Sequence, residues 1–248
     1  GNPAVGLGIV WVLAAVAVYY PSSDGLRRDV QKSLLVGAVN DVMPPSGPLM
    51  QALHRIDPFP RIAASTGEIA KPDQGTGSKA AVQKAAESVV KVSGTCNGFG
   101  VMGSGWAVGP DTFVTNAHVV AGQDDTTIQT NDGQSASATP IAFNTRNDIA
   151  ILHADVDLPA LPALARARRG TAAAVIGYPN DGPLTITPAR AGETRILIGQ
   201  DSYGSGSFER SMLALRGNVR HGNSGGPLVD SRGQVLGTVF AATTEGPQ

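Results

Sequence analysis

Apolar residues follow three different patterns along the chain, and the first is an uncharged apolar run from Ala4 to Tyr20. Its length is at the short end of what crosses a bilayer as a helix, and Tyr19 and Tyr20 are aromatics of the kind found at membrane interfaces. We therefore expect residues 1–21 to be a transmembrane helix or the end of one, which contacts the membrane through residues 4–20. A signal peptide, disfavoured because no positive segment precedes the run, and a buried globular helix are the alternatives.

The second pattern covers residues 22–77, which we interpret as an amphipathic helix followed by a Pro-rich linker. Apolar residues recur every four positions from Leu26 to Val39, as on one face of a short helix. Residues 42 to 77 are rich in proline and glycine, and proline restricts the backbone and removes hydrogen-bond donors, so no long element is expected there. Ser78 is expected to cap a short helix that continues to Glu87.

The third pattern begins at Val89, where short apolar runs alternate with turn residues at intervals of roughly ten positions. This spacing is typical of an all-β barrel or sandwich, and the lack of strand–helix alternation argues against a parallel α/β sheet. A bare glycine pattern from Gly98 to Gly103 lacks a βαβ context and is interpreted as a β-turn. The expected strands are residues 89–92, 105–108, 113–115, 126–130, 149–153, 172–176, 195–198, 212–215 and 235–240.

Composition narrows the class of function. The chain has 19 basic and 20 acidic residues and a formal net charge of −1, whereas a nucleic-acid surface needs a basic excess, so no nucleic-acid partner is expected. The histidines lack the clustered spacing of metal ligands, and neither a metal nor another cofactor is predicted. The single cysteine, Cys96, is either a small buried hydrophobe or pairs with a cysteine outside this sequence.

Ser224 is the strongest candidate for chemistry, because it stands in the glycine-rich run Gly222-Asn223-Ser224-Gly225-Gly226. Acyl transfer needs a nucleophile on a tight turn and backbone N–H groups that stabilise an oxyanion, and glycines permit both. The N–H groups of Gly222 and Ser224 would form this oxyanion hole. The same letters fit the nucleophile elbow of α/β-hydrolases, but in that fold the histidine follows the serine, and no histidine follows Ser224 here.

His118 and Asp148 are the predicted partners of Ser224. His118 lies where an apolar strand gives way to a polar turn, a rigid position for a general base, whereas His54 and His153 are interpreted as a surface residue and a strand-end residue. Asp148 directly precedes the apolar run 149–152, so its carboxylate is expected to be partly buried and to need a partner. Asp124 and Asp125 are alternatives in a polar loop. The order His118, Asp148, Ser224 is that of chymotrypsin-type triads.

The segments around these three residues, together with Gly177-Tyr178-Pro179, resemble the trypsin-like serine protease superfamily and most closely its bacterial HtrA-type branch. The resemblance covers residues 86 to 248. It implies a chymotrypsin-like double β-barrel, with His118 and Asp148 on the first barrel and Ser224 on the second. It also implies that residues 78–248 form a protease domain that is incomplete at its C-terminal end. Asn223 stands where digestive relatives carry aspartate, so activation through a newly cut N-terminus is not expected.

Two further residues are predicted to contact substrate. If no insertion intervenes, Asn218 would lie near the floor of the specificity pocket, where a neutral side chain argues against a preference for Lys or Arg. His221 would lie at the lip of the oxyanion loop, and an imidazole titrates near pH 6.5, so its protonation could change the loop in acid. The alternative for His221 is an exposed residue without a role.

Taken together, these patterns predict a membrane-tethered serine endopeptidase. Its protease domain would act on proteins or peptides on the periplasmic, extracytoplasmic side of the cell membrane, and the resemblance implies a role in envelope stress or acid resistance. The alternative is a catalytically silent binding module with the same fold. The intact set His118, Asp148 and Ser224 argues against that alternative, because silent relatives usually lose one member.

Overall fold

The computed structural model describes most of the chain from Ile69 to Phe240, and two short strands beside it. The described residues are 61–62, 69–96, 99–164, 166–200, 207–240 and 242–243. The predicted membrane segment at residues 4–20, the amphipathic helix, most of the linker and His54 lie outside them. No helix within the described ranges is long and apolar enough to cross a membrane.

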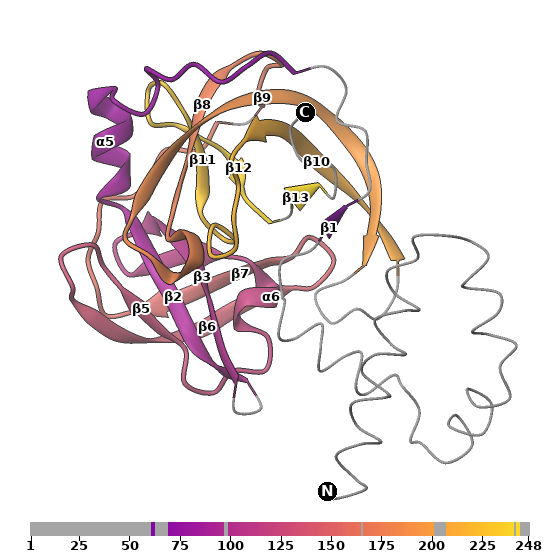
Figure 1. The fold of residues 1–248 in the computed structure, drawn as a ribbon. Coiled ribbons are helices and arrows are strands. Elements are labelled where there is room, and N and C mark those ends of the chain that lie inside the picture. Colours follow the sequence, from indigo (N-terminus) through magenta and orange to yellow (C-terminus); the bar gives the residue numbers. More distant parts are fainter. Residues whose placement is uncertain are drawn as a thin grey trace, which may run out of the picture. The chain divides into compact units, whose positions relative to one another are not determined.

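Six antiparallel strands close into the first barrel, which occupies the lower half of the molecule in Figure 1. The strands pair around the barrel in the order β2-β3-β4-β7-β6-β5, and β5 pairs with β2 to close it. The short helix α6 (Ala117–Val120) follows β4 directly. The strands are β2 (Val89–Cys96), β3 (Phe99–Gly109), β4 (Thr112–Thr115), β5 (Thr127–Gln129), β6 (Ser135–Asn144) and β7 (Ile149–Ala154).

Aliphatic side chains fill the inside of this barrel, as expected from a composition with only 5% aromatic residues. Alternate residues of the strands point inward, since successive side chains of a strand face opposite sides of the sheet. Phe113, Ile128 and Leu152 are all within 1% of complete burial at its centre. The short helix α6 is buried on the same core through Val119 and Val120, which anchors the segment that carries His118.

The second half of the domain is an open sheet of five antiparallel strands in the order β10-β9-β8-β11-β12, above the first barrel in Figure 1. Among the described residues β10 and β12 are the two edges of this sheet, so it is a half-barrel. The expected all-β, chymotrypsin-like double-barrel architecture is confirmed. The elements are β8 (Ala172–Gly177), the 3-10 turn η1 (Pro179–Asp181), β9 (Thr185–Gln200), β10 (Ser207–Gly217), β11 (Pro227–Asp230) and β12 (Val235–Thr238).

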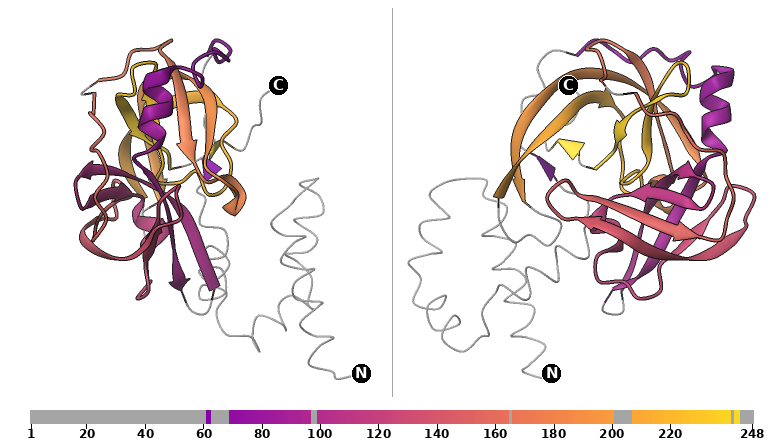
Figure 2. Two further views of the ribbon diagram at one scale, coloured as in Figure 1. Left: turned by 90° about the vertical axis from the view of Figure 1, so that its left-hand side faces the viewer. Right: turned by 180° about the vertical axis from the view of Figure 1, so that it is seen from behind.

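A second hydrophobic cluster joins the two halves. Trp106 and Val114 of the first barrel pack in the same buried cluster as Ile176 and Val229 of the half-barrel. Helix α5 (Ala80–Ala86) adds Val82 to this cluster, and both views of Figure 2 show it beside the half-barrel. Because the halves share one core, residues of one half keep a defined position against residues of the other.

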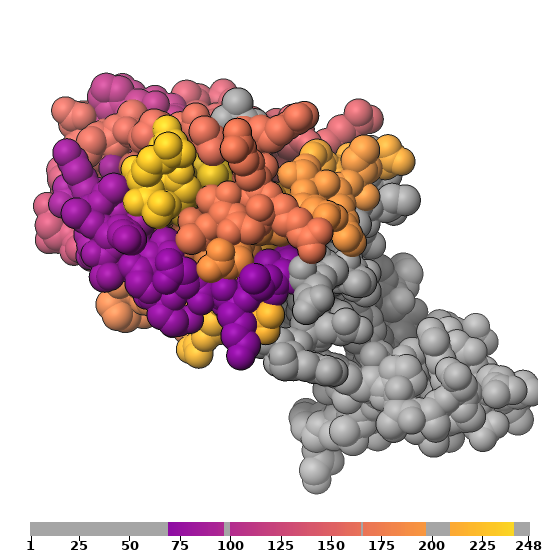
Figure 3. Space-filling model, turned by 90° about the horizontal axis from the view of Figure 1, so that it is seen from above, coloured from indigo at the N-terminus to yellow at the C-terminus, as the bar shows by residue number. Residues whose placement is uncertain are grey.

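The start of the domain differs from the prediction at Ser78. The N-cap of α5 is Lys79, without a side-chain cap, and the Ser78 hydroxyl donates instead to the carbonyl oxygen of Gly75 at 3.0 Å. Residues 69–77 form no long element, but they contact the half-barrel: Arg190 Nε donates to the carbonyl oxygen of Lys71 at 2.7 Å. In Figure 3 this indigo segment crosses the surface beside the orange strands.

Two further features depart from the expected strand pattern. The predicted turn at the glycine pattern is wrong for residues 99–103, which belong to strand β3 (Phe99–Gly109). Strand β6 was not predicted, because nearly all of its residues are exposed and its sequence lacks an apolar alternation. A two-residue strand within the predicted linker, β1 (Arg61–Ile62), pairs in parallel with β13 (Ala242–Thr243).

Truncation of Leu152 tests the closed barrel. Leu152→Ala removes a fully buried side chain from its centre and is expected to lower the free energy of unfolding by about 2–5 kcal/mol, since lost burial and a residual cavity add. Ile196→Ala, at a side chain that is 70% exposed, is the matched control and is expected to change it by less than about 0.5 kcal/mol. Urea unfolding followed by tryptophan fluorescence measures both. Equal effects of the two variants would contradict the described core.

Candidate active site

The Ser224 loop is a tight turn that requires glycine at two positions, Gly222 and Gly225. Gly222 and Gly225 have φ values of 86° and 84°, in the left-handed region that favours glycine. A Cβ atom at Gly222 would overlap the carbonyl oxygen of Tyr178, and one at Gly225 would overlap that of Ser104. The loop is therefore pressed against both halves of the domain, and Ser224 itself is only 3% exposed.

The peptide group between His221 and Gly222 has a defined orientation. The carbonyl oxygen of His221 accepts a hydrogen bond from the N–H of Asn180 at 2.7 Å. The N–H and C=O of a trans peptide point in opposite directions, so the N–H of Gly222 is directed away from Asn180. Among the described residues, neither this N–H nor that of Ser224 donates to a protein acceptor. Both donors are thus available to an oxygen atom bound beside Ser224.

His118 and Asp148 form a buried, doubly hydrogen-bonded pair. The Nδ1 atom of His118 lies 2.6 Å from Oδ2 of Asp148, and the backbone N–H of His118 donates to Oδ1 at 2.9 Å. The two residues are 8% and 1% exposed. An ionised carboxylate only accepts hydrogen bonds, so the ring proton stands on Nδ1 and the lone pair on Nε2. This tautomer is the one that a general base acting through Nε2 requires.

Asp148 adopts a backbone conformation that its neighbours support. Its φ is 55°, which is unusual for a residue other than glycine, although aspartate and asparagine tolerate it best. The buried amide of Asn116 donates from Nδ2 to the carbonyl oxygen of Asp148 at 2.8 Å. Since Asn116 is the residue before helix α6, the same short segment that carries His118 also holds the backbone of its acid partner.

The structure places Ser224 beside this segment. A Cβ atom at Gly225 would lie 3.1 Å from the backbone nitrogen of Asn116, and one at Gly103 would touch both Val119 and the carbonyl oxygen of Ser224. Ser224 Oγ and His118 Nε2 are both buried, and neither makes a hydrogen bond within the described residues. Ser224 Oγ and His118 Nε2 are therefore not hydrogen-bonded to each other in this structure.

Ser104 was missed by the sequence analysis, although it holds the loop together. Its N–H donates to the carbonyl oxygen of Ser224 at 2.7 Å, and its hydroxyl donates to that of Gly222 at 2.6 Å. The same hydroxyl accepts from the N–H of Tyr178 at 3.0 Å. A serine in a strand between two glycines has no recognisable pattern, so only the contact with the distant loop identifies it.

Tyr178 supports the loop from the other side. Burial raises the pKa of its hydroxyl to about 12, with a smaller contribution from Asp132. The hydroxyl thus stays protonated at neutral pH and lies 3.4 Å from the carbonyl oxygen of Val89 as a donor. Tyr178 directly precedes the turn η1, which contains Asn180.

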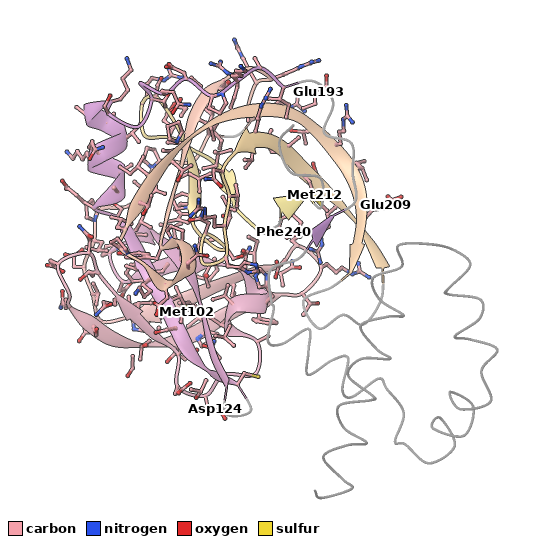
Figure 4. The ribbon with its side chains drawn as sticks, viewed as in Figure 1. Met102, Asp124, Glu193, Glu209, Met212 and Phe240 are labelled. Carbon is pink, nitrogen blue, oxygen red and sulfur yellow. The ribbon has the colours of Figure 1, made fainter. Side chains whose placement is uncertain are left out.

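The remaining predicted residues lie apart from this cluster or at its edge. Asn218 is exposed, with Oδ1 at 3.5 Å from Arg220 Nε, and the described residues build no enclosed floor around it. The side chain of His221 is exposed at the lip of the loop. His153 is exposed near Asp111, and Asp124 lies at the end of the first barrel farthest from the half-barrel (Figure 4). Cys96 is buried and forms no disulfide.

Comparison with known proteins identifies the class. Residues 103–237 match the family described as the trypsin-like peptidase domain. The matched region runs from within β3 to within β12 and contains His118, Asp148 and Ser224, whereas β2 precedes it. The chain belongs to the family of trypsin-like peptidases.

Particular relatives are bacterial proteases of the HtrA type. Serine protease Rv3671c (MarP) of Mycobacterium tuberculosis is 33% identical, in an alignment that covers 97% of this chain and 64% of the relative. Serine endoprotease DegS of Escherichia coli is 30% identical over 86% of this chain and 59% of the relative. The chain thus spans less than two thirds of the length of these relatives.

A solved structure of Rv3671c supports the same assignment. The crystal structure of its protease in the active form superposes with a TM-score of 0.70 at 36% identity. The superposition covers 75% of this chain and 83% of that structure.

Removal of the Ser104 hydroxyl tests its place beneath the loop. Ser104→Ala leaves the buried carbonyl oxygen of Gly222 without its donor, which is expected to cost about 1–3 kcal/mol of unfolding free energy. Ser135→Ala, at an exposed position of β6, is the control and is expected to have little effect. Thermal unfolding followed by circular dichroism measures both. A Ser104→Ala variant as stable as the control would show that the bond does not hold the loop.

Proposed function

We propose that the chain is a serine endopeptidase that uses Ser224 as nucleophile, His118 as general base and acid, and Asp148 to orient His118. The observation that carries this proposal is the buried His118–Asp148 pair, with Nδ1 and Oδ2 2.6 Å apart, on a segment against which the Ser224 loop is packed. Buried charged groups are costly unless paired, and this pair leaves Nε2 as the basic atom. Membership of the trypsin-like peptidase family supports the same assignment.

Catalysis would proceed in two stages. Ser224 Oγ attacks the carbonyl carbon of the peptide bond while its proton moves to His118 Nε2, and the carbonyl oxygen takes up the negative charge. When the C–N bond breaks, Nε2 returns this proton to the leaving amine, and an ester between the acyl group and Ser224 remains. Water then attacks the ester, with its proton passing to Nε2 and on to Ser224 Oγ as the acid leaves.

The oxyanion in each stage would be stabilised by the N–H groups of Gly222 and Ser224. Such donors are effective because they are already oriented before charge develops, and loss of one typically lowers kcat by about 10²–10³-fold. The hydrogen bond from Asn180 to His221, which directs the Gly222 N–H away from Asn180, supports this role. Asn218 and His221 are proposed to contact substrate at the edge of the site.

Reaction with a fluorophosphonate probe separates an enzyme from a silent binding module. Wild type is expected to be labelled and to cleave casein, whereas Ser224→Ala is expected to do neither. Asp148→Asn tests the charge of Asp148 alone, because asparagine tolerates the φ of 55° at this position while the negative charge is lost. It is expected to lower kcat by about 10⁴-fold.

Asp124→Asn, at the exposed alternative acid, is the matched control and is expected to leave kcat unchanged. Labelling that persists in Ser224→Ala would place the nucleophile elsewhere. A folded wild type that neither reacts with the probe nor cleaves casein would favour the silent binding module.

We further propose that residues 4–20 tether the protease to the membrane and that it acts on the extracytoplasmic side, in envelope stress or acid resistance. The support for the tether is the uncharged apolar run in the sequence, whereas the role in envelope stress or acid resistance is only what the HtrA-type resemblance implies. Removal of residues 1–21 is expected to move the protein from the carbonate-resistant membrane fraction to the soluble fraction. A double substitution of Leu13 and Val16 by aspartate should do the same, because each charge is costly in a bilayer. Membrane retention of both variants would contradict the tether.

A further inference from the structure

The turn η1, beside the Ser224 loop, has an unusual backbone. Asn180 and Asp181 are consecutive residues with φ values of 53° and 59°, and neither is glycine. Only three residues other than glycine have a positive φ within the described part of the chain, and the third is Asp148. Left-handed conformations of such residues are unfavourable and persist only where the surroundings hold them. The surroundings of this turn therefore need to supply a compensating interaction.

Lys91 supplies that interaction from the other half of the domain. It lies on strand β2 of the first barrel, and its Nζ donates to Oδ1 of Asp181 at 2.8 Å and approaches the carbonyl oxygen of Asp181 at 3.4 Å. The ammonium group also lies 5.5 Å from the centre of the Tyr178 ring, within the range of a cation–π contact. The side chain of Lys91 thus contacts both Tyr178, before the turn, and Asp181, at its end. This lysine side chain is only 20% exposed.

The turn that Lys91 contacts is hydrogen-bonded to the peptide group between His221 and Gly222, whose N–H is the proposed oxyanion donor. Asn180, between the two residues that Lys91 contacts, donates its N–H to the carbonyl oxygen of His221 at 2.7 Å. If the turn relaxes to an ordinary right-handed conformation, this N–H no longer points at His221. The peptide between His221 and Gly222 would then be able to rotate, since Gly222 has no side chain to prevent it. A rotated peptide would direct a carbonyl oxygen, rather than an N–H, toward the developing negative charge.

We propose that Lys91 and Asp181 are positioning residues that keep the oxyanion hole in its active arrangement. They touch neither Ser224 nor His118 and act through the chain Lys91, Asp181, Asn180, His221, Gly222. This inference rests on the proposed function, because it assigns a role in the same site. The hydroxyl of Ser104 bonds the carbonyl oxygen of Gly222, which belongs to the following peptide group, so the Lys91–Asp181 pair acts on the peptide between His221 and Gly222 alone.

The kinetic test uses Lys91→Met, which keeps the length of the side chain and removes its charge, with a fluorogenic peptide that the wild type cleaves. We expect kcat to fall about tenfold, less than after complete loss of an oxyanion donor, while KM changes less than twofold. Binding of a peptide aldehyde, which forms a tetrahedral adduct on Ser224, is expected to weaken by a similar factor. The variant Lys91→Arg is expected to retain most of the wild-type kcat, because an arginine at this position can also pair with Asp181.

Two further variants make the test specific. Asp181→Asn is expected to resemble Lys91→Met, and the double variant is expected to be no worse than either single one, as for two partners of one interaction. Lys84→Met, at an exposed lysine of α5, is the matched control and should match the wild type. If Lys91→Met kept kcat within twofold of the wild type, or if it raised KM alone, the positioning role would be wrong.

A measurement that does not depend on catalysis separates this inference from the proposed function. Amide hydrogen exchange at Asn180, whose N–H is bonded to His221, is expected to be faster in Lys91→Met than in wild type and Lys84→Met. Unchanged exchange would overturn the inference even in an active enzyme. If the wild type proved inactive, the proposed function would fail, and exchange at Asn180 would still decide whether Lys91 holds the turn.

Discussion

The hydrogen bonds of Ser104 are the constraint on which the rest of the site depends. This residue of the first barrel bonds the carbonyl oxygens of Gly222 and Ser224 and accepts the N–H of Tyr178. Its own carbonyl oxygen accepts from the hydroxyl of Thr115, next to the segment that carries His118. Ser104 is completely buried, so each of these bonds forms in a low-dielectric interior, where an unmet partner is costly. The backbone and side chain of this one residue thereby align the Ser224 loop with the segment that carries His118.

The close approach at Ser104 explains the glycines around it. Side chains at Gly103 and Gly225 would collide with the backbone or side chains of the opposite half. The glycine pattern, which in the sequence suggested a turn, lies in strand β3 from Phe99 onward, and the missing side chain of Gly103 allows the two halves of the domain to touch. Close approach of backbones and turn formation require the same residue type, so glycine positions alone did not distinguish them.

Much of the fold was predictable because buried strands carry a periodic apolar signal. Strands β2, β4, β7 and β8 were all anticipated, and so was the burial of Asp148 ahead of an apolar run. Strand β6 was not, since it covers the barrel with polar and exposed residues and owes its place to hydrogen bonds with β5 and β7. Ser104, Asn116 and Lys91 were also missed, because their roles arise from contacts between segments distant in sequence. The exposed setting of Asn218 depends on the path of the chain after β10, which spacing did not reveal.

The division of the candidate residues between two halves has a consequence for folding. His118 and Asp148 belong to a barrel that closes within the first part of the domain, whereas Ser224 comes from strands that pair later along the chain. Contacts of such large sequence separation form slowly, since a long loop must be closed before they stabilise anything. The arrangement of His118, Asp148 and Ser224 would thus be completed only when the two halves dock. A partly opened chain would carry all three residues without the arrangement on which the proposed activity depends.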